Sequence, residues 1–394
     1  MTRLKAAPSL AFLAILLACE PGASQQAHDS RQAALATDTG NGALSALEAI
    51  SGRMTPGRWS QIPNSSISTV LATRDQAPEN GGINGPRGVI DSWNGAAYDN
   101  NRHHWYFHGG GHQDYSGNEV YRFDFTSLKW TRLTEPSPLV DTSLDSCRLP
   151  QDGPPSIHTY DGLIYAPTTD TIWYFTRRGG YCRKRAPTAR RTKAPARVWE
   201  FNLVTLTWTE HFPYTADGFV YTAFDKVTGE ILVIGDREIT AFNPSTKTFQ
   251  PPLRSGRPGD GSGFMDEKRR RFVQLSRQGL TYIDRSRGRF GPIIELISHK
   301  GLTARTGVGN CFQGGIDHDT KRDLYVMWCG ESDVYAIDPD TLDFKTFEDT
   351  AASPVASKAS HRIYSKWIYI KESDVFAGYN NHKGNVLLYR LPEH

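Results

Sequence analysis

Short runs of alternating apolar and polar residues recur along most of this chain, and residues 93–133 show them most clearly. A run at 95–98 that opens with small residues and an aromatic run at 104–107 flank an Asp-Asn-Asn sequence that is typical of a tight turn. Residues 119–124 alternate in the same way, and a short turn separates them from a fourth run at 130–133. The pattern predicts a four-stranded antiparallel sheet, which needs neighbouring sheets to bury both of its faces.

One spacing repeats through the chain and marks further sheets. An Asp or Asn that ends the third strand is followed, six residues later, by an aromatic residue of the fourth. The pairs are Asp124 and Trp130, Asn202 and Trp208, Asn243 and Phe249, Asp284 and Phe290, and Asp338 and Phe344. Repeats of about 40 to 54 residues, with longer intervals where a loop is inserted, indicate a β-propeller whose blades surround a central channel.

The sequence predicts an all-β fold with six blades. The predicted blades span residues 93–133, 158–210, 221–250, 263–290, 312–347 and 361–392. The last blade lacks a fourth strand, and the segment around Trp59 resembles the missing one, so we expect an N-terminal strand to close the ring. A seventh blade in residues 66–90 is the alternative, although that segment is rich in Gly, Pro and Asn and is typical of a loop.

The repeats resemble the kelch family of propellers, which includes galactose-oxidase-like proteins. The matching features are glycine doublets after the second strand, an aromatic residue in the third strand and the later Trp or Phe. They are found at Gly109-Gly110-Gly111, Gly179-Gly180, Tyr121, Trp199 and Tyr335. The resemblance covers residues 57–392 and implies the fold, but kelch repeats occur with many functions. The copper chemistry of galactose oxidase is not expected, because no adjacent Tyr-His pair occurs.

The first nineteen residues have the features of an export signal. Arg3 and Lys5 precede an apolar run that is too short to span a bilayer, and the run ends in Leu16-Leu17-Ala18-Cys19. This ending resembles a bacterial lipobox, which implies that Cys19 is lipidated and that the mature chain is anchored in the cell envelope, at the outer membrane. An ordinary cleaved signal with a chance cysteine is the alternative.

The predicted domain organisation follows from composition. Residues 1–19 are the signal, residues 20–56 are rich in Ala, Ser, Gln and Gly and form a tether, and residues 57–394 form the propeller. A short helical segment within residues 42–52 is the one element expected in the tether. The chain has 394 residues, 11% of them aromatic, and its net charge of +3 is too small to imply nucleic-acid binding.

Four cysteines remain once Cys19 is set aside, an even number that suits an oxidising compartment. Cys311 and Cys329 flank one predicted strand-turn-strand and should face each other. This pairing leaves Cys147 and Cys182 to join two loops at the same rim. A metal site is the rival interpretation, but the four residues lack the close paired spacing of zinc ligands.

Propeller geometry predicts where a binding site lies. Loops between blades, and loops between second and third strands, meet around the channel mouth on one face. The residues expected on this face include His112, Asp114, Tyr115, His158, Tyr160, Arg177, Arg178, Tyr221, Arg237, Arg277, Arg305, His361, Asn380, Asn381 and His382. The turns on the opposite face carry Asp-Asn-Asn, Asp-Lys-Val-Thr-Gly and Asp-Pro-Asp, which are ordinary turn sequences.

An insertion in the second blade adds positive charge to the predicted site face. It contains Arg177, Arg178 and seven further Lys or Arg residues without an acid among them. Guanidinium groups bind carboxylates and sulfates in a bidentate way, so this charge suits an acidic polysaccharide, although a solvated loop that keeps the protein soluble is an equal alternative. No cofactor is expected. A metal at His108, His112 and Asp114 would require the glycines between them to fold back.

The face also resembles, in residue type and placement, the sites of propeller-fold polysaccharide lyases such as ulvan lyases. Elimination across C4 and C5 of a uronate needs a cation at the carboxylate, a base for the C5 proton and an acid for the leaving oxygen. The resemblance implies that Arg177 or Arg305 neutralises, that His112 or His158 is the base and that Tyr160 is the acid. Substrate contacts would come from Arg178, Tyr221, His361 and His382.

Two function classes therefore stay open. The first is an envelope-anchored, monomeric protein that binds or cleaves an acidic polysaccharide, most concretely a carbon–oxygen lyase. The second is a noncatalytic kelch-repeat lipoprotein that binds a glycan or another envelope protein at its rim. A concave cluster of His112, His158, Tyr160 and Arg177 would favour the first, and an exposed apolar patch the second.

Overall fold

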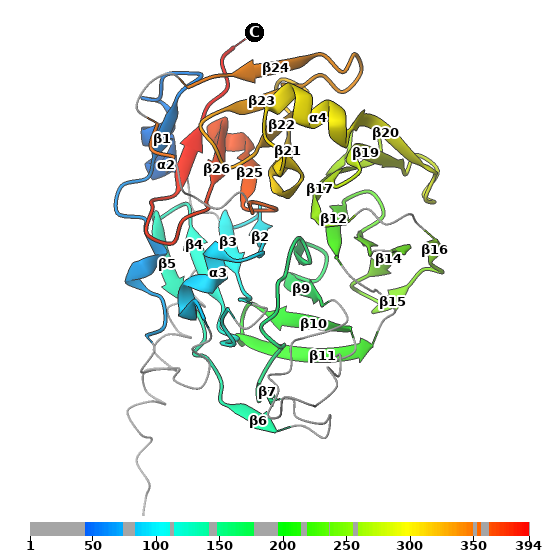
Figure 1. Ribbon diagram of the computed structural model, residues 1–394. Helices are drawn as coiled ribbons and strands as arrows, with labels where there is room; N and C mark the ends of the chain where they lie inside the picture. Colours follow the sequence, from blue (N-terminus) through cyan, green and yellow to red (C-terminus); the bar gives the residue numbers. More distant parts are fainter. Residues whose placement is uncertain are drawn as a thin grey trace, which may run out of the picture. The chain divides into compact units, whose positions relative to one another are not determined.

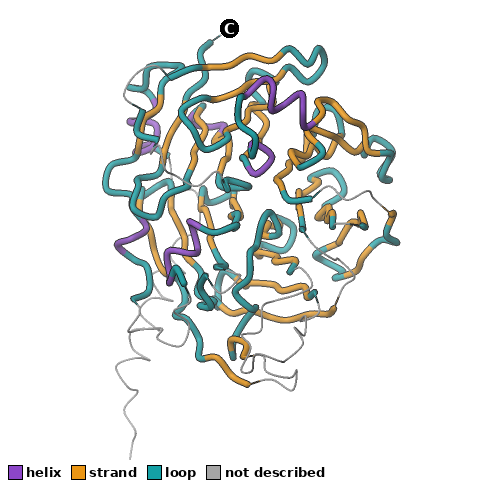
Figure 2. The backbone as a smooth tube through the Cα atoms, in the orientation of Figure 1, coloured by secondary structure: helices purple, strands orange, loops and turns teal. Residues whose placement is uncertain are grey.

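The computed structural model is a ring of antiparallel sheets (Figure 1), and Figure 2 shows that strands and loops make up nearly all of it. The described residues are 44–73, 83–110, 114–141, 148–176, 196–213, 219–235, 237–254, 259–349, 353–355 and 362–393. They belong to a unit that spans residues 40–394. The fold is all-β, with six propeller blades of four principal strands each, as the repeats predict.

The blades follow one another around the ring in chain order. Blade 1 contains β2 (Ala96–Asp99), β3 (His104–Phe107), β4 (Tyr121–Asp124) and β5 (Lys129–Arg132). Blade 2 contains β8 (Leu163–Ala166), β9 (Thr171–Phe175), β10 (Arg197–Asn202) and β11 (Thr207–Pro213). Blade 3 contains β12 (Tyr221–Asp225), β13 (Glu230–Ile234), β14 (Glu238–Asn243) and β15 (Thr248–Phe249), and β16 (Leu253–Arg254) also pairs with β14.

The second half of the ring repeats this order. Blade 4 contains β17 (Gly261–Asp266), β18 (Arg271–Ser276), β19 (Gly279–Asp284) and β20 (Ile293–Ser298). Blade 5 contains β21 (Gly315–Asp319), β22 (Leu324–Trp328), β23 (Val334–Ile337) and β24 (Phe344–Phe347). Blade 6 contains β25 (Trp367–Ile370), β26 (Val375–Gly378), β27 (Leu387–Tyr389) and, as its outer strand, β1 (Trp59–Gln61).

The remaining elements are short. β6 (Leu139–Asp141) and β7 (Arg148–Pro150) form a separate hairpin between blades 1 and 2. Within the described residues the helices are α2 (Ser45–Ser51), α3 (Gly88–Asp91) and α4 (His299–Thr306), and the 3-10 turns are η1 (Ile67–Thr69), η3 (Gly85–Arg87), η4 (Cys311–Gln313) and η5 (Lys371–Ser373). Among the described residues, no helix is both long and apolar enough to cross a membrane.

The six-residue spacing arises from a turn that is built the same way in successive blades. The Asp124 carboxylate accepts the backbone N–H of Thr126 at 2.7 Å and that of Ser127 at 3.3 Å, which closes the turn between β4 and β5. The same contacts recur at Asn202, Asn243 and Asp338. Trp130 then packs on Phe107 and Phe123 at 5.0 and 5.1 Å between ring centroids. The polar residue therefore fixes the turn and the aromatic residue fills the core.

A second repeated turn joins the first and second strands of every blade. The residue just before the second strand has a positive φ in all six blades: His103, Asp170, Gly229, Arg270, Asp323 and Asp374. Five of these six residues are not glycine, so the surrounding contacts of the tight turn must hold their backbones in a conformation that such residues rarely adopt. His103 is thus a turn residue.

Ion pairs join neighbouring blades at these turns. The Arg102 guanidinium lies 2.9 Å from Asp99 in its own blade and 2.5 Å from Asp170 in the next. Arg322 pairs in the same way with Asp319 and Asp374. Further inter-blade pairs join Arg269 to Asp323 and Arg270 to Asp225. Because one partner of each arginine is a fully buried carboxylate, removing the arginine would leave that charge uncompensated.

The N-terminal strand closes the ring, as predicted. β1 pairs with β27 in the register Trp59 with Tyr389, and the blue and red segments meet in Figure 1. The Trp59 indole donates to the Ser332 carbonyl at 2.5 Å and lies 5.2 Å from the ring of Trp328 and 5.8 Å from that of Trp367. The closing strand thus completes the sheet of blade 6 and also joins that blade to the core of blade 5.

The folded unit starts before the predicted boundary at residue 57. Leu44, Leu47 and Met54 are buried in the cluster that also contains core residues of blades 1 and 6. The Arg390 guanidinium donates to the Ser51 carbonyl at 3.3 Å. Apolar residues spaced along α2 anchor this segment, so the part of the predicted tether from Leu44 onward belongs to the core.

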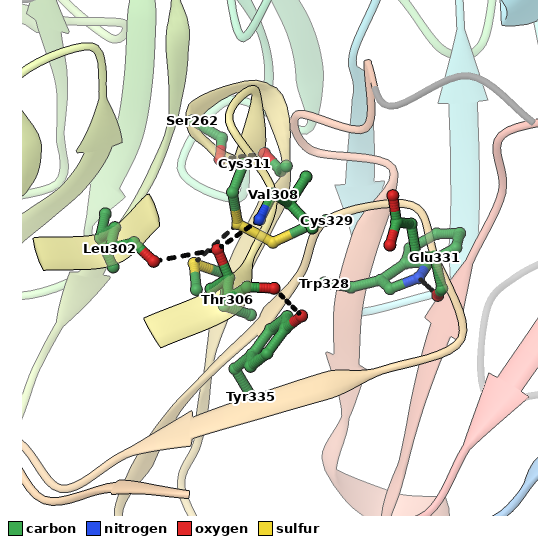
Figure 3. The surroundings of a disulfide bond; sticks show 11 residues. Ser262, Leu302, Thr306, Val308, Cys311, Trp328, Cys329, Glu331 and Tyr335 are labelled. Atoms are coloured by element: carbon green, nitrogen blue, oxygen red, sulfur yellow. Dashed lines mark hydrogen bonds between the residues drawn. A yellow bond between two sulfur atoms is a disulfide. The ribbon is translucent and has the colours of Figure 1, made fainter. Parts of the chain in front are cut away.

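One of the two predicted disulfides lies within the described residues and is formed. Cys311 of η4 is bonded to Cys329, which follows β22, and their Cα atoms are 4.8 Å apart (Figure 3). Both residues are buried. The bond ties the loop that enters blade 5 to the second strand of that blade. Cys147 and Cys182 lie outside the described residues.

Replacing Trp59 by alanine is expected to lower the free energy of unfolding by about 3 to 5 kcal/mol, because it truncates a buried indole and weakens the closing strand. Urea unfolding of the purified protein measures the change. Val227→Ala is the control, since Val227 is 70% exposed and its truncation should leave the midpoint unchanged. Equal midpoints for both variants would show that the ring does not depend on this strand.

Replacing both Cys311 and Cys329 by alanine is expected to cost about 3 kcal/mol of stability, because the bond closes a loop between residues 18 apart. Reduction of the wild-type protein should lower its unfolding midpoint by a similar amount. Mass mapping of the unreduced protein tests the bond directly, and free thiols at both positions would refute it.

Candidate functional site

The innermost strands of the six blades begin at one face of the ring and end at the other. Parallel bridges join Asn94 to Tyr160 and Asp161 to Tyr221, so the first three of these strands start side by side. A Cβ on Gly95 would lie 2.2 Å from the Tyr160 carbonyl oxygen, which shows how closely the chains approach here. We call this end, formed by residues 93–95, 158–161, 219–221, 259–261, 313–314 and 362–365, the loop face. The other end is the turn face.

A stacked group of side chains occupies the loop face beside blades 1, 2 and 6. The His158 ring is buried; its Nε2 lies 3.1 Å from the Asp114 carboxylate and its Nδ1 lies 3.3 Å from the Tyr160 hydroxyl. The Trp93 ring lies 4.6 Å from the His158 ring, and the Arg362 guanidinium carbon lies 3.2 Å from the Trp93 centroid. Burial lowers the pKa of Arg362. This arrangement holds a partly buried cation on an aromatic surface.

Two tyrosines at the centre of the face have unusual backbone conformations. Tyr160 has φ 48° and Tyr364 has φ 52°, and their rings meet edge to face at 5.7 Å. Bulky residues rarely adopt a positive φ, and outside the repeated turns such residues are often held by a functional constraint. Both tyrosines come just before an innermost strand, and their contact joins blade 2 to blade 6 although these blades are not neighbours.

A buried carboxylate organises the opposite side of the loop face. Asp260 accepts hydrogen bonds from Arg277 Nε at 2.6 Å and from Gln313 Nε2 at 2.5 Å, and the Tyr364 hydroxyl lies 3.5 Å away. The hydrogen bond to Asp260 raises the pKa of Arg277, while burial and then Asp260 raise that of Tyr364. The Tyr221 hydroxyl donates to the Gly259 carbonyl beside it. Gln313 follows the disulfide cysteine Cys311 by two residues, so that bond helps to position it.

The structure brings three of the predicted site residues together and gives two others contacts outside that group. His158, Tyr160 and Tyr221 lie on the loop face. Arg305 is on α4, where it donates to the Leu342 carbonyl at 3.3 Å and stacks on Phe344, an outer-strand residue of blade 5. His382 contacts Asp91 through its backbone N–H and its ring, with 2.7 Å between Nδ1 and the carboxylate. His112, Arg177, Arg178, His361 and Cys19 lie outside the described residues.

His108 and Asp114, two of the three residues discussed above as possible metal ligands, have different partners in the structure. The His108 ring is buried against Tyr174 and Trp208, and burial lowers its pKa to about 4. Asp114 instead contacts His158 and accepts a hydrogen bond from Asn84. In the part of the chain that the structure describes, no three His, Cys, Asp or Glu residues are placed to hold a metal.

Four loop-face residues were not among the predicted site residues: Trp93, Asp260, Arg362 and Tyr364. Their common feature is that each comes within a few residues of an innermost strand, at the start of a blade. A search of every blade start for aromatic and charged residues would have found them. What the sequence does not show is that blades 1, 4 and 6 direct these residues to one face.

A buried lysine lies beneath this face. Lys366 is fully buried, and its ammonium donates to the Ile90 carbonyl at 2.9 Å. Burial lowers its pKa to about 7. The folded protein therefore releases this proton well below the pH at which the unfolded chain, with an ordinary lysine pKa of about 10.4, does so.

Lys366→Met should change how stability depends on pH. Between about pH 7 and pH 9 the unfolded wild-type chain binds a proton that the folded chain lacks, so its free energy of unfolding should rise relative to the variant by about 1 kcal/mol per pH unit. Below about pH 6 the difference between the two proteins should stay constant. Lys129→Met, at an exposed lysine, is the control. Parallel pH profiles for wild type and Lys366→Met would contradict the lowered pKa.

Comparisons with known proteins show the fold and not the function. No family model matches this chain, and no curated protein matches it in sequence. An auxiliary nutrient binding protein from Bacteroides ovatus has 11% identity and a TM-score of 0.48, over 76% of this chain and 69% of that chain. One from Bacteroides thetaiotaomicron has 10% identity and a TM-score of 0.49, over 76% and 68%. A Bacteroides thetaiotaomicron protein of unknown function has 11% identity and a TM-score of 0.50, over 84% and 75%. The last of these structures shows a likeness in fold alone, and the likeness to kelch propellers stays a resemblance.

Proposed function

We propose that this protein binds an acidic glycan at its loop face. The observation that supports this most strongly is the group formed by Arg362, Trp93, His158 and Tyr160. An arginine binds a carboxylate through two parallel hydrogen bonds, and an aromatic ring offers an apolar surface for the C–H groups of a sugar. Arg277 adds a second guanidinium on the far side of Tyr364, and it is 58% exposed.

The physical argument rests on the burial of Arg362. Burial removes hydration from this cation and lowers its pKa, and a carboxylate that binds beside it would add a charge-assisted contact to those that it already makes. Of the two nearby carboxylates, Asp114 is hydrogen-bonded to His158. Asp260 accepts hydrogen bonds from Arg277 and Gln313. These contacts hold the charged groups in place before a ligand binds, which lowers the entropic cost of binding.

β-Elimination is the second candidate, and the position of Tyr160 beside His158 and Arg362 favours it. Both nitrogens of His158 already have partners, so this residue orients Tyr160 and Asp114. In such a reaction Arg362 would neutralise the uronate carboxylate, His112 would take the C5 proton as the C4–O bond breaks, and Tyr160 would give its proton to the leaving oxygen. The roles first assigned to His112, Arg177, Arg178 and His361 remain part of this proposal.

The cellular setting is also a proposal. A buried disulfide is typical of proteins that fold in an oxidising compartment, which supports export. The lipobox-like ending at Cys19 would then anchor a monomeric, kelch-like protein in a bacterial envelope. A noncatalytic protein that binds another envelope protein at the same face is the alternative.

Arg362→Ala is expected to weaken binding of a uronate polymer by about ten- to a hundredfold, since it removes a charge-assisted contact. Arg305→Ala is the matched control, because it removes the same charge from a residue that contacts blade 5 instead. Titration calorimetry with polyuronates of different sugars, at low and moderate salt, gives the affinities. New ultraviolet absorbance from unsaturated products in the same samples would reveal elimination.

The outcomes separate the candidates. Binding without absorbance supports a glycan-binding protein, and absorbance that Tyr160→Phe abolishes supports the lyase. If Arg362→Ala and Arg305→Ala weaken binding equally, the effect is general charge and the loop face is not the site. If no acidic polymer binds the wild-type protein, the glycan proposal fails and a protein partner is favoured.

A further inference from the structure

The central channel contains a cavity of about 840 Å³, distinct from the loop-face group. Its lining includes residues from the innermost strand of every blade and from the turns that follow them, among them Asn100, Thr320 and Glu372. The residues proposed to bind glycan are not among those that line it. A cavity of this size, with aromatic walls that include Tyr98, Phe264 and Tyr369, matches the dimensions of small-molecule sites.

Asp161 marks the end of the cavity nearest the loop face. Its Oδ2 accepts the Gly263 backbone N–H at 2.9 Å, which links blade 2 to blade 4 although these blades are not neighbours. The side chain therefore reaches into the channel. Burial raises the pKa of Asp161, and hydrogen bonds from Ser365 and Gly263 oppose this shift only in part.

Asp317 lies deeper along the wall, in the middle of β21. One carboxylate oxygen accepts the Tyr369 backbone N–H at 2.7 Å, and the other accepts the His318 N–H at 2.8 Å. Burial raises its pKa to about 6. Among the described residues, neither Asp317 nor Asp161 has a Lys, Arg or His within ion-pair distance, so both carboxylates face the cavity without a counter-ion.

Lysines line the opposite end, at the turn face. Lys226, Lys268, Lys321 and Lys371 each follow the end of an innermost strand and belong to the cavity lining. Lys268 pairs with Asp323 and Lys321 with Asp374. For Lys226 and Lys371, both exposed, the described residues include no ion-pair partner. Glu267, Asp323 and Glu372 line the same end, so the mouth carries four lysines and three acids. Two lysines without an ion-pair partner in the described part of the chain therefore lie at one end of the cavity, and two buried acids lie further in.

We propose that this cavity is a second binding site, for a small zwitterionic molecule such as a free amino acid or short peptide. Its protonated amine would lie between Asp161 and Asp317, and its carboxylate would meet Lys226 and Lys371 at the mouth. A metal ion fits less well, because two carboxylates are too few ligands and the cavity is much larger than one ion. This site does not depend on the proposed glycan site.

The test uses the full chain and three probe mixtures: the twenty dipeptides Gly-X, the same mixture with acetylated amines, and the same mixture with amidated carboxyl groups. Saturation-transfer NMR reports binding, and competition titration gives the affinity. The unmodified mixture should bind, whereas both blocked mixtures should bind about tenfold more weakly or worse. Added polyuronate should leave these signals unchanged, which separates this site from the loop face.

Variants locate the site. Asp317→Asn and Lys226→Met should each weaken dipeptide binding by about tenfold. Asp343→Asn, at an exposed carboxylate on the outer part of blade 5, should not. Since Lys226 is exposed, its variant should keep the fold even if Asp317→Asn does not, and thermal unfolding checks both. The proposal is overturned if no dipeptide binds, if the acetylated mixture binds as well as the unmodified one, or if Lys226→Met and Asp343→Asn behave alike.

Discussion

The pairing of β1 with β27 is the contact on which the rest of the ring depends. A propeller blade packs only against its neighbours, so an unfinished blade leaves an open sheet edge and a gap in the circle of cores. Here the closing strand comes from the beginning of the domain, and Trp59 places its ring against Trp328 and Trp367 from two blades. The geometry of all six innermost strands, and so of both proposed sites, depends on this closure.

The two faces of the ring are stabilised by different interactions. At the turn face, arginines such as Arg102 and Arg322 bind buried carboxylates of one blade and a turn of the next. These contacts repeat with the blades and fix their spacing. At the loop face the connections differ in length and sequence, and a disulfide holds one of them. A regular scaffold thus supports an irregular face, which is the usual place for binding residues.

The channel interior separates the two proposed sites. Asp161 reaches from blade 2 to the backbone of blade 4, between the tyrosines of the loop face and the cavity below them. A ligand at Arg362 and a ligand at Asp317 would therefore approach from opposite ends. The loop face would bind an anion and the cavity a zwitterion, so the two sites would select ligands of different net charge.

The sequence by itself determined the repeated units, because each blade carries its own local signals: an Asp or Asn that closes a turn and an aromatic residue six positions later. It also predicted the closing strand and the Cys311–Cys329 bond, and it placed His158, Tyr160 and Tyr221 at the channel mouth. Only the tertiary structure decided that Arg305 packs against blade 5, that Leu44 belongs to the core, and that Arg362, Trp93 and Asp260 share one face. Local patterns specify strands and turns, whereas contacts between blades depend on the angles at which whole sheets pack, and no short stretch of sequence encodes those angles.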